Sequence, residues 1–339
     1  MAYQSKIFII FTIILVILLG SLTPKFIYGY FESTVGGSLV ATIKPKNPGP
    51  NELVSISLAG YGYELNQSQI TWFKNGKLIN QGYGENKYSF TNNDLGKPTA
   101  ITIAVKTNTN RNIVKNLTFI PAEVDILWET NTYVPDFYQG ASLPTTGSDI
   151  NLTAIPQIID KDNNLIPSDK LVFTWRLDYK NLINESGTGK NKISFTAGLS
   201  PKKHIVEVTV SYPASGVETY KKIEIPIVNP ELVVYPYKPL IGVVKSEAII
   251  NKFSPTNKEE SFKVEPYFFP HFEVLADSLL YNWAIDGKTT NTFGPILNTE
   301  ITDNQGEIKI NVSARSLFNR FLTNQKDFMI DLNNNNDLF

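Results

Sequence analysis

A tryptophan-centred pattern occurs three times in the chain, and it constrains the fold more than any other feature of the sequence. The tryptophans are Trp72, Trp175 and Trp283, and they lie 103 and 108 residues apart. A period of about 100 residues is too long for one unit of a solenoid, but it suits one β-sandwich domain per copy. The repeat therefore predicts three similar domains in tandem.

Each copy contains the same features in the same order. Apolar residues alternate with polar ones around the tryptophan, as in Phe173, Trp175 and Leu177, and this period of two predicts a strand with one buried face. A polar pair then follows in each copy, namely Asn75-Gly76, Asp178-Tyr179 and Asp286-Gly287. Asn-Gly and Asp-Gly pairs tolerate positive φ angles, so we expect a tight hairpin after each tryptophan strand.

A second alternating strand closes each copy. Its inward-facing residues are predicted to be Ile101, Ile103 and Val105, then Val206, Val208 and Val210, and finally Ile308, Ile310 and Val312. In the second copy, Glu207 and Thr209 are expected to face solvent. No segment after residue 40 shows an apolar stripe of helical period, so we expect an all-β protein in which the three tryptophans anchor the cores.

The tryptophan-turn-strand pattern, seen in WFKNGK and WAIDGK, resembles that of bacterial immunoglobulin-like (Ig-like) and PKD-like extracellular domains. The resemblance covers three stretches of roughly 70 residues, and the chain lacks the WDFGDG-like turn of the PKD consensus. It implies a fold of three tandem Ig-like β-sandwich domains. Domains of this kind mostly act as spacers, adhesive modules or assembly subunits, which is what the resemblance implies for this chain.

Linkers predict the domain boundaries. Ile120-Pro121-Ala122 separates the first two units, and a run with four prolines over 225–240 joins the second to the third. The predicted segments are a signal peptide or membrane anchor (1–36), three Ig-like domains (37–121, 122–228 and 229–332) and a polar tail (333–339). Because proline-rich joints are stiff, we expect the three domains to stand in a row.

The N-terminus carries an export signal. An apolar run, IFIIFTIILVILL, follows Lys6, and its length fits the core of a signal peptide better than a full span of about 20 residues. The cleavage site is poor, because only Gly29 is small in Ile27-Tyr28-Gly29, so an uncleaved anchor through residues 7–22 is the alternative. Either outcome places the remainder on the extracellular face of the cell membrane or on the cell surface.

Composition excludes several classes of function. The formal charge is −1, from 31 basic and 32 acidic residues, so nucleic acid is not an expected partner. The absence of cysteine excludes disulfides, thiolate metal ligands and a cysteine nucleophile. The two histidines, His204 and His271, belong to different copies, and no catalytic motif accompanies them. We therefore predict no enzymatic activity and no cofactor.

Two motifs match known functional signals, but the residues around them argue against those functions. The phrases QGYGENK (81–87) and SGTGKNK (186–192) resemble a phosphate-binding loop, but Asn184 and Asn191 stand where that loop needs glycine and Ser or Thr, so we predict a turn. The pentapeptide LPTTG (143–147) matches the sortase sorting signal, which lies near a C-terminus ahead of an apolar tail. Here a long folded pattern follows, so we predict a loop.

One weak metal candidate is present. Asp160, Asp162 and Asn164 alternate like the opening of a calcium loop, but leucines occupy the places where an EF-hand needs glycine and glutamate. A looser calcium site that includes Asp169 is the functional interpretation. A solvated turn of Asp and Asn residues is the preferred one.

Three loop segments combine tyrosine and phenylalanine with proline. Rigid aromatic side chains of this kind suit protein interfaces and sugar stacking, but they equally suit the packing of domain joints, which we favour. The partner-binding candidates are Tyr133, Phe137, Tyr138, Tyr235, Tyr237, Phe268 and Phe269.

Together these features predict a non-enzymatic, exported cell-envelope protein. Its role would be structural or adhesive, or that of an accessory subunit of a surface appendage or secretion complex, with envelope or surface-assembly proteins as partners. A carbohydrate-binding protein or envelope enzyme is the alternative, and it requires Tyr133, Phe137, Tyr138 and an acidic pair to meet in one cleft. A third option is a protease inhibitor or chaperone-like module that binds a partner strand at an exposed sheet edge.

Overall fold

The computed structural model describes residues 38–199, 202–301 and 306–333. These residues form an all-β protein, as predicted, in which strands are interrupted by short turns of 3₁₀-helix, η1 (Leu65–Gln67) and η2 (Ser168–Lys170), and by one short α-helix, α2 (His271–Leu275). The predicted signal or anchor (1–36, with its apolar segment 7–22) and residues 334–339 of the predicted tail lie outside the described residues. Within the described ranges, no helix has the length and apolarity needed to cross a membrane.

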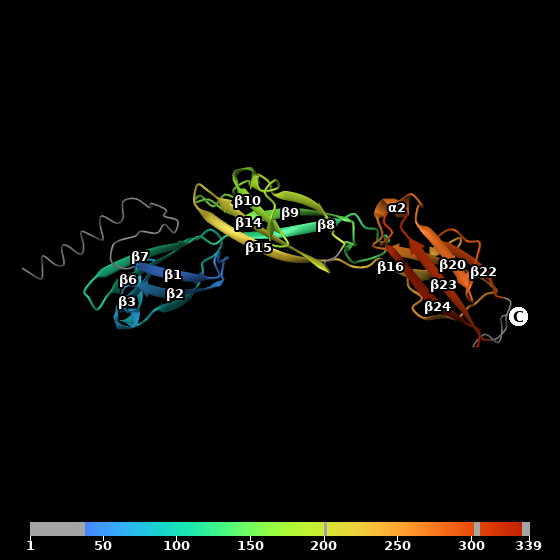
Figure 1. The fold of residues 1–339 in the computed structure, drawn as a ribbon, viewed down its shortest axis with the longest axis horizontal. Helices are drawn as coiled ribbons and strands as arrows, with labels where there is room; N and C mark the ends of the chain where they lie inside the picture. Colours follow the sequence, from blue (N-terminus) through green and yellow to red (C-terminus); the bar gives the residue numbers. More distant parts are fainter. Residues whose placement is uncertain (1–37, 200–201, 302–305, 334–339) are drawn as a thin grey trace, which may run out of the picture. The chain divides into compact units, whose positions relative to one another are not determined.

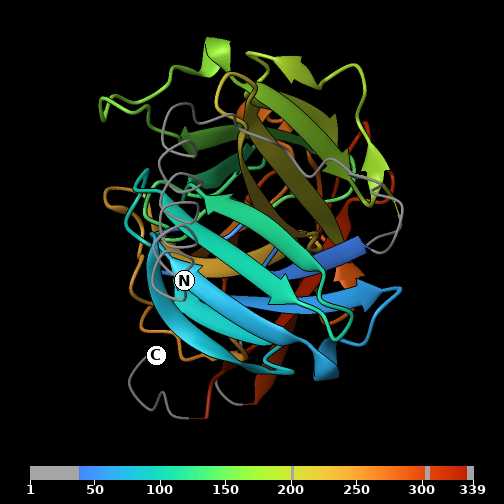
Figure 2. The ribbon, with the colours of Figure 1, turned by 90° about the vertical axis from the view of Figure 1, so that its left-hand side faces the viewer.

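The first strand set pairs a three-stranded with a four-stranded sheet, coloured blue to cyan in Figure 1 and Figure 2. One sheet has the order β1-β2-β5 and the other β4-β3-β6-β7. The strands are β1 (Ser38–Lys44), β2 (Leu53–Tyr61), β3 (Gln69–Lys74), β4 (Lys77–Tyr83), β5 (Lys87–Thr91), β6 (Thr99–Lys106) and β7 (Asn112–Phe119).

The second strand set repeats this order. One sheet runs β13-β9-β8 and the other β11-β10-β14-β15, with the short β12 paired to β10. The strands are β8 (Glu123–Thr130), β9 (Asp149–Gln157), β10 (Val172–Leu177), β11 (Lys180–Asn181), β12 (Gly187–Thr188), β13 (Lys192–Thr196), β14 (Lys203–Tyr212) and β15 (Val217–Pro226).

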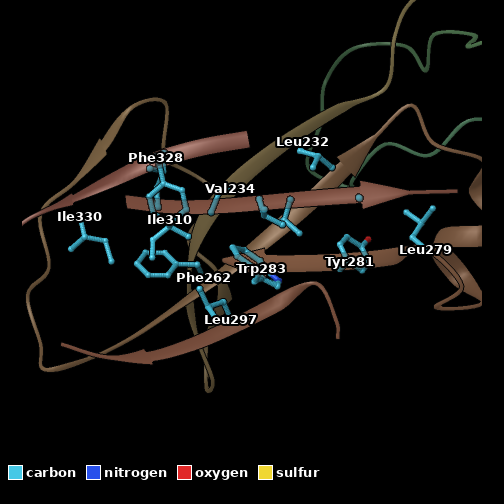
Figure 3. Packing of buried hydrophobic residues seen from close by; sticks show 14 of the residues in the cluster. Leu232, Val234, Phe262, Leu279, Tyr281, Trp283, Leu297, Ile310, Phe328 and Ile330 are labelled. Carbon is cyan, nitrogen blue, oxygen red and sulfur yellow. The ribbon is translucent and has the colours of Figure 1, made fainter. Parts of the chain in front are cut away.

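The third strand set has the same plan with two short additions, β17 and β18. Its sheets run β17-β16-β19-β22 and β18-β24-β23-β20-β21, and β18 joins β24 in parallel. The strands are β16 (Glu231–Lys238), β17 (Gly242–Val243), β18 (Lys252–Phe253), β19 (Glu259–Tyr267), β20 (Leu280–Ile285), β21 (Lys288–Thr289), β22 (Ile296–Glu300), β23 (Glu307–Arg315) and β24 (Thr323–Asp331). Figure 3 shows Trp283 among Val234, Phe262 and Ile310 in the core between the two sheets.

The strand order repeats three times, yet the chain divides into two compact units. One unit comprises residues 1–124, 156–172 and 209–220, and the other comprises 125–155, 173–208 and 221–339. The division passes through the second strand set, so the three-domain boundaries predicted from the linkers stay a prediction.

The three repeated tryptophans are fully buried, and each donates a hydrogen bond to a backbone carbonyl at the equivalent place in its copy. The indole Nε1–H of Trp72 donates to the carbonyl of Glu85 at 2.8 Å, and that of Trp175 donates to the carbonyl of Lys190 at 2.9 Å. Trp283 donates to the carbonyl of Gly294 at 2.9 Å. A buried indole N–H needs such an acceptor, and the polar loop before the next strand supplies it each time.

Each glycine-rich phrase contains a turn, as predicted, between β4 and β5 and between β12 and β13, and this turn completes the core. Gly84 has a φ of 71°, while Gly187 and Gly189 have φ angles of 139° and 73°. These angles favour glycine, and they turn the chain so that the next carbonyl faces the tryptophan. No feature of a phosphate cradle is needed to explain the two phrases.

The hairpins after the tryptophan strands also repeat in detail. Both residues of each polar pair have positive φ, including Asp178 at 48° and Tyr179 at 65°, so all three turns are of type I′. The first side chain of each pair accepts a hydrogen bond from the backbone of the neighbouring strand, as Asp178 Oδ1 does from the amide of Ile205 at 2.9 Å. Asn75 and Asp286 make the equivalent bond.

One inference from strand alternation is wrong. Glu207 was expected to face solvent, but its side chain is buried, with 6% of its surface exposed. Arg176 Nη1 lies 3.0 Å from its Oε2 atom, so an ion pair covers the carboxylate on the outer side of the sheet. Alternation predicts the face on which a side chain lies, but it does not show whether another side chain covers it.

The edge strands β7 and β4 of the first strand set have features that hinder pairing with another chain. Lys115, on the inward side of β7, extends its Nζ to within 3.4 Å of the carbonyl of Leu39 on β1. An inward-pointing lysine is a common protection against pairing with another chain. The pairing of β4 with β3 shifts register at Trp72/Phe73, and such an irregularity also disrupts a sheet edge. These edges give no support to binding by strand addition.

Candidate functional site

Most of the predicted partner-binding aromatics meet in one cluster, which we call the aromatic joint. Its buried members are Tyr235 of β16, Tyr267 of β19 and the adjoining Phe268. Partly buried side chains packed against them include Phe137 and Leu143 from the segment 131–148, which connects β8 to β9. The joint thus fastens a long loop of the second strand set to two strands of the third, and all of it lies within one compact unit.

Backbone hydrogen bonds make the joint a continuation of the sheet structure. The amide of Tyr133 donates to the carbonyl of Phe269, and the amide of Phe268 donates to the carbonyl of Tyr133, both at 2.7 Å. Phe268 has a φ of 63°, which is rare for a bulky residue and costs about 1–3 kcal/mol. The pairing with Tyr133 holds Phe268 in this strained conformation.

A buried carboxylate lies at the base of the joint. Glu265 has 3% of its surface exposed, and it forms an ion pair with Lys263 at 2.8 Å. The hydroxyl of Tyr133 donates to Glu265 Oε2 at 3.1 Å. Burial, and then the negative charge of Glu265, raise the pKa of Tyr133 well above its ordinary value. The tyrosine therefore stays a neutral hydrogen-bond donor, which is a structural role.

The aromatic rings in the joint pack edge to face. Phe137 meets Tyr235 with ring centroids 5.5 Å apart, and Tyr138 meets Tyr267 at 5.3 Å. The hydroxyls of Tyr235 and Tyr267 lie 3.0 Å apart and share a hydrogen bond. Lys245 places its ammonium group 5.3 Å from the ring centre of Phe137. Such pairs contribute about 0.5–1.5 kcal/mol each beyond the burial of their surface.

The remaining candidates occupy separate positions. Phe269 is fully buried in the core of the third strand set, and Tyr237 is partly buried on β16. Of the seven predicted aromatics, Tyr138 alone is exposed, at 37%. The rings named as partner-binding candidates are thus largely in contact with one another.

The pentapeptide LPTTG forms part of the same joint. Thr145 is fully buried, and its hydroxyl donates to the carbonyl of Phe268 at 3.2 Å. The carbonyl of Pro144 accepts from the amide of Val228 at 3.0 Å. The segment lies in a loop ahead of β9, as predicted, and it is packed against its surroundings.

The weak calcium candidates form a compact turn. Asp160 Oδ1 accepts hydrogen bonds from the amides of Asp162 and Asn164, both at 2.9 Å. These backbone bonds, led by that from Asn164, lower the pKa of Asp160. The geometry is that of a solvated Asx turn, which needs no cation to explain it.

His204 is a buried structural residue. Its Nδ1 atom lies 2.7 Å from Asp178 Oδ2, and its Nε2 atom accepts from the amide of Gly198 at 3.3 Å. The imidazole therefore links the type I′ turn of Asp178 to the neighbouring loop. Among the described residues, no three side chains of His, Asp or Glu gather in a way that could hold a metal ion.

Sequence reasoning missed one surface. The β23–β24 hairpin carries Leu317, Phe318 and Phe321, all more than half exposed, and Phe272 and Leu275 of α2 are exposed as well. The available signal was the run SLFNRFL (316–322), in which large apolar residues fall in a turn between two alternating strands. Exposed apolar side chains in a group mark interaction sites more often than isolated ones do.

Comparisons with known proteins find similar solved structures but no family. No family model matches the chain, and no curated protein matches its sequence. The chain is similar to the three N-terminal domains of the bacteriophage RB49 Highly Immunogenic Outer Capsid protein (Hoc), with 10% identity over 88% of this chain and 99% of that one, at a TM-score of 0.26. It is similar to the central fibronectin-III array of RIM-binding protein, with 12% identity over 87% and 97%, at 0.30.

A further similar structure is SGBP-B of the Bacteroides ovatus mixed-linkage glucan utilization locus in complex with a mixed-linkage heptasaccharide, with 10% identity over 88% of this chain and 71% of that one, at a TM-score of 0.20. Ig-like and fibronectin-III domain arrays are thus among the solved structures that match the chain. The Ig-like resemblance that the tryptophan-turn-strand pattern predicts is one of fold.

Proposed function

We propose that the chain is a non-enzymatic, exported cell-envelope protein of three Ig-like domains, which acts as a structural or accessory subunit of a surface assembly. One observation carries this proposal: the aromatic side chains best suited to hold a ligand are used to build the aromatic joint. A protein that only spaces or presents a surface needs stiff connections between its modules. The joint supplies a connection of that kind between the loop 131–148 and strands β16 and β19.

The contacts of the joint support a stiff connection at the segment 131–148. Phe137 and Leu143 remove apolar surface from water against Tyr235 and its neighbours, and backbone hydrogen bonds of Tyr133 fix the register. Linkers without such contacts behave as flexible chains, and relative motion of neighbouring modules is then the default. A strained residue, Phe268, is tolerated at the centre of the joint, which requires surroundings that over-determine its conformation.

A carbohydrate-binding or enzymatic role is less well supported. That alternative requires exposed faces of Tyr133, Phe137 and Tyr138 together with two acids in one cleft. Tyr133 bonds Glu265, Phe137 packs on Tyr235, and Glu265 forms an ion pair with a lysine. A hollow lined by Ser313, Thr323, Asn324 and Gln325 shares no residue with the joint and contains no ionisable side chain.

Cross-linking with mass spectrometry on native envelopes tests the proposal. A lysine-reactive reagent should join this chain to envelope or surface-assembly proteins, and a retained peptide with Lys6 would show that the N-terminal segment stays attached. Absence of cross-links to any envelope protein would contradict the accessory role. Binding of the purified chain to a panel of glycans, if lost in Tyr138→Ala and kept in the exposed control Tyr83→Ala, would establish the carbohydrate-binding alternative instead.

A further inference from the structure

Five exposed apolar side chains lie on two adjacent segments, α2 and the β23–β24 hairpin; α2 is labelled in Figure 1. We call them the apolar patch: Phe272, Leu275, Leu317, Phe318 and Phe321, with 54%, 70%, 54%, 73% and 57% of their surface exposed. The rings of Phe272 and Phe318 are in contact, with centroids 5.6 Å apart, so the two segments form one surface. Leu275 follows Phe272 by three residues and therefore lies on the same side of the helical turn.

A buried carboxylate fixes the hairpin that carries the patch. Glu273 is fully buried, and it accepts hydrogen bonds from Ser316 Oγ at 2.7 Å and from the amide of Leu317 at 3.1 Å. Ser316 Oγ in turn accepts from the amides of Phe318 and Asn319, at 3.2 and 2.8 Å. Burying a carboxylate is unfavourable unless hydrogen bonds replace those it made with water. The hydrogen bonds of Glu273 therefore hold the exposed apolar loop in one conformation, although burial of the carboxylate is itself unfavourable.

The patch borders the aromatic joint. Asn319 Nδ2 donates to the carbonyl of Thr146 at 3.0 Å, so one flank of the hairpin is already covered by the segment 131–148. The amide of Phe321 is held by Asn319 Oδ1 at 3.1 Å. The exposed Phe318 and Phe321 lie within two residues of Asn319, in a loop that these bonds hold in one conformation, and a preformed loop loses little entropy when it binds.

Two arginines lie in the same hairpin as the patch, and their positive charges indicate the kind of partner that it binds. Arg320 places its guanidinium carbon 5.2 Å from the ring centre of Phe321, and Arg315 ends β23 at the start of the same hairpin. Elsewhere in this strand set lysines form ion pairs, as in Lys252–Glu307, Lys263–Glu265 and Lys309–Asp327. Arg315 and Arg320 form no ion pair with any residue in the described ranges. They are available to an acidic partner.

We propose that the apolar patch docks a protein partner that presents an apolar anchor flanked by aspartate or glutamate side chains. This inference rests on the accessory role proposed above and assigns its contact surface. Arginine beside large aromatic side chains is the composition of interface hot spots. The side chains of the patch offer no hydrogen-bonding group to a sugar, and the patch adjoins the segment 131–148, which this chain already packs against protein, so we favour a protein over a membrane.

Site-specific photo-cross-linking tests the proposal, because the chain contains no cysteine and accepts one label cleanly. The full chain carrying Phe318→Cys, labelled with a benzophenone maleimide, is irradiated with the isolated native envelope fraction. Phe293→Cys is the matched control, since Phe293 is 85% exposed and lies outside the patch. We expect an adduct at position 318, absent at 293, on a partner peptide with apolar residues next to acids.

Charge reversal provides the second readout. Arg315→Glu together with Arg320→Glu should reduce the yield of that adduct about tenfold, the loss expected when a paired interfacial charge is reversed, while Lys288→Glu leaves it unchanged. A phospholipid adduct, equal yields at 318 and 293, or an adduct insensitive to both arginines would overturn the proposal. If lysine cross-links to envelope proteins persist while the adduct at 318 is missing, the contact surface is wrong and the accessory role stands.

Discussion

Replacing Trp175 by phenylalanine tests whether the turn that follows each tryptophan strand is part of the core. The indole of Trp175 is fully buried, and its Nε1–H donates to the carbonyl of Lys190 at 2.9 Å. Phenylalanine keeps most of the apolar ring but removes the donor, so the carbonyl loses its partner. The same bond is present at Trp72 and Trp283, which gives two internal comparisons in one molecule.

The expected loss follows from two contributions. A typical hydrogen bond between neutral groups contributes about 1 kcal/mol to stability. The smaller ring leaves a void of at least a methyl group, which costs about 1 kcal/mol more. The local stability around β10 should therefore fall by about 2 kcal/mol, and because 1.4 kcal/mol corresponds to a factor of about ten, amide exchange there should accelerate about 30-fold.

Hydrogen exchange followed by mass spectrometry measures this effect strand by strand, which a global unfolding curve of several modules does not. Protection should fall in β10 and in the turn 186–191, while β3 and β20, around the unaltered Trp72 and Trp283, keep theirs. Unchanged exchange in β10 would show that the carbonyl of Lys190 contributes nothing. Equal acceleration in all three strands would refute the assignment of one tryptophan to one core.

Three further changes have defined outcomes. Tyr179→Gly should raise the melting temperature, because Tyr179 has a φ of 65° and glycine removes a strain of about 1 kcal/mol. Raising the pH should destabilise the third strand set and the aromatic joint, because burial raises the pKa of Tyr133, Tyr267 and Tyr281. Their contribution is complete below the unfolded pKa of about 10 and is lost as the pH rises above it towards the raised pKa of the folded state, as absorbance of tyrosinate during unfolding would show. Glu273→Gln should lower stability by about 1–3 kcal/mol in thermal unfolding, because an amide cannot accept both hydrogen bonds equally well, whereas the exposed control Glu259→Gln should not.

Local pattern predicted the repeated elements well. Alternation around Trp72, Trp175 and Trp283 identified the central strands, and the polar pairs identified the hairpins, because both signals depend on neighbours close in sequence. The same reasoning failed at Glu207, whose burial depends on Arg176, a residue on another strand. Coverage of a side chain by a distant partner has no local signature.

The candidate binding surfaces also depend on contacts between residues that are distant in sequence. The sequence singled out Tyr133, Phe137 and Tyr235, since aromatic residues beside proline in loops need an explanation. It could not decide whether they face a partner or each other, because that depends on pairing Tyr133 with Phe269, which is distant in sequence. The apolar patch could not be predicted from the sequence, because it depends on contact between Phe272 and Phe318, which are distant in sequence.

The packing of LPTTG bears on how this segment meets enzymes that read extended peptides. Such enzymes bind their substrate as an open strand, yet Thr145 is fully buried and bonded to Phe268, and Pro144 is bonded to Val228. The pentapeptide is therefore cleavable only in molecules in which the loop has come away from the aromatic joint. The rate at which a transpeptidase or protease specific for this pentapeptide cleaves the chain would therefore measure how often the aromatic joint opens.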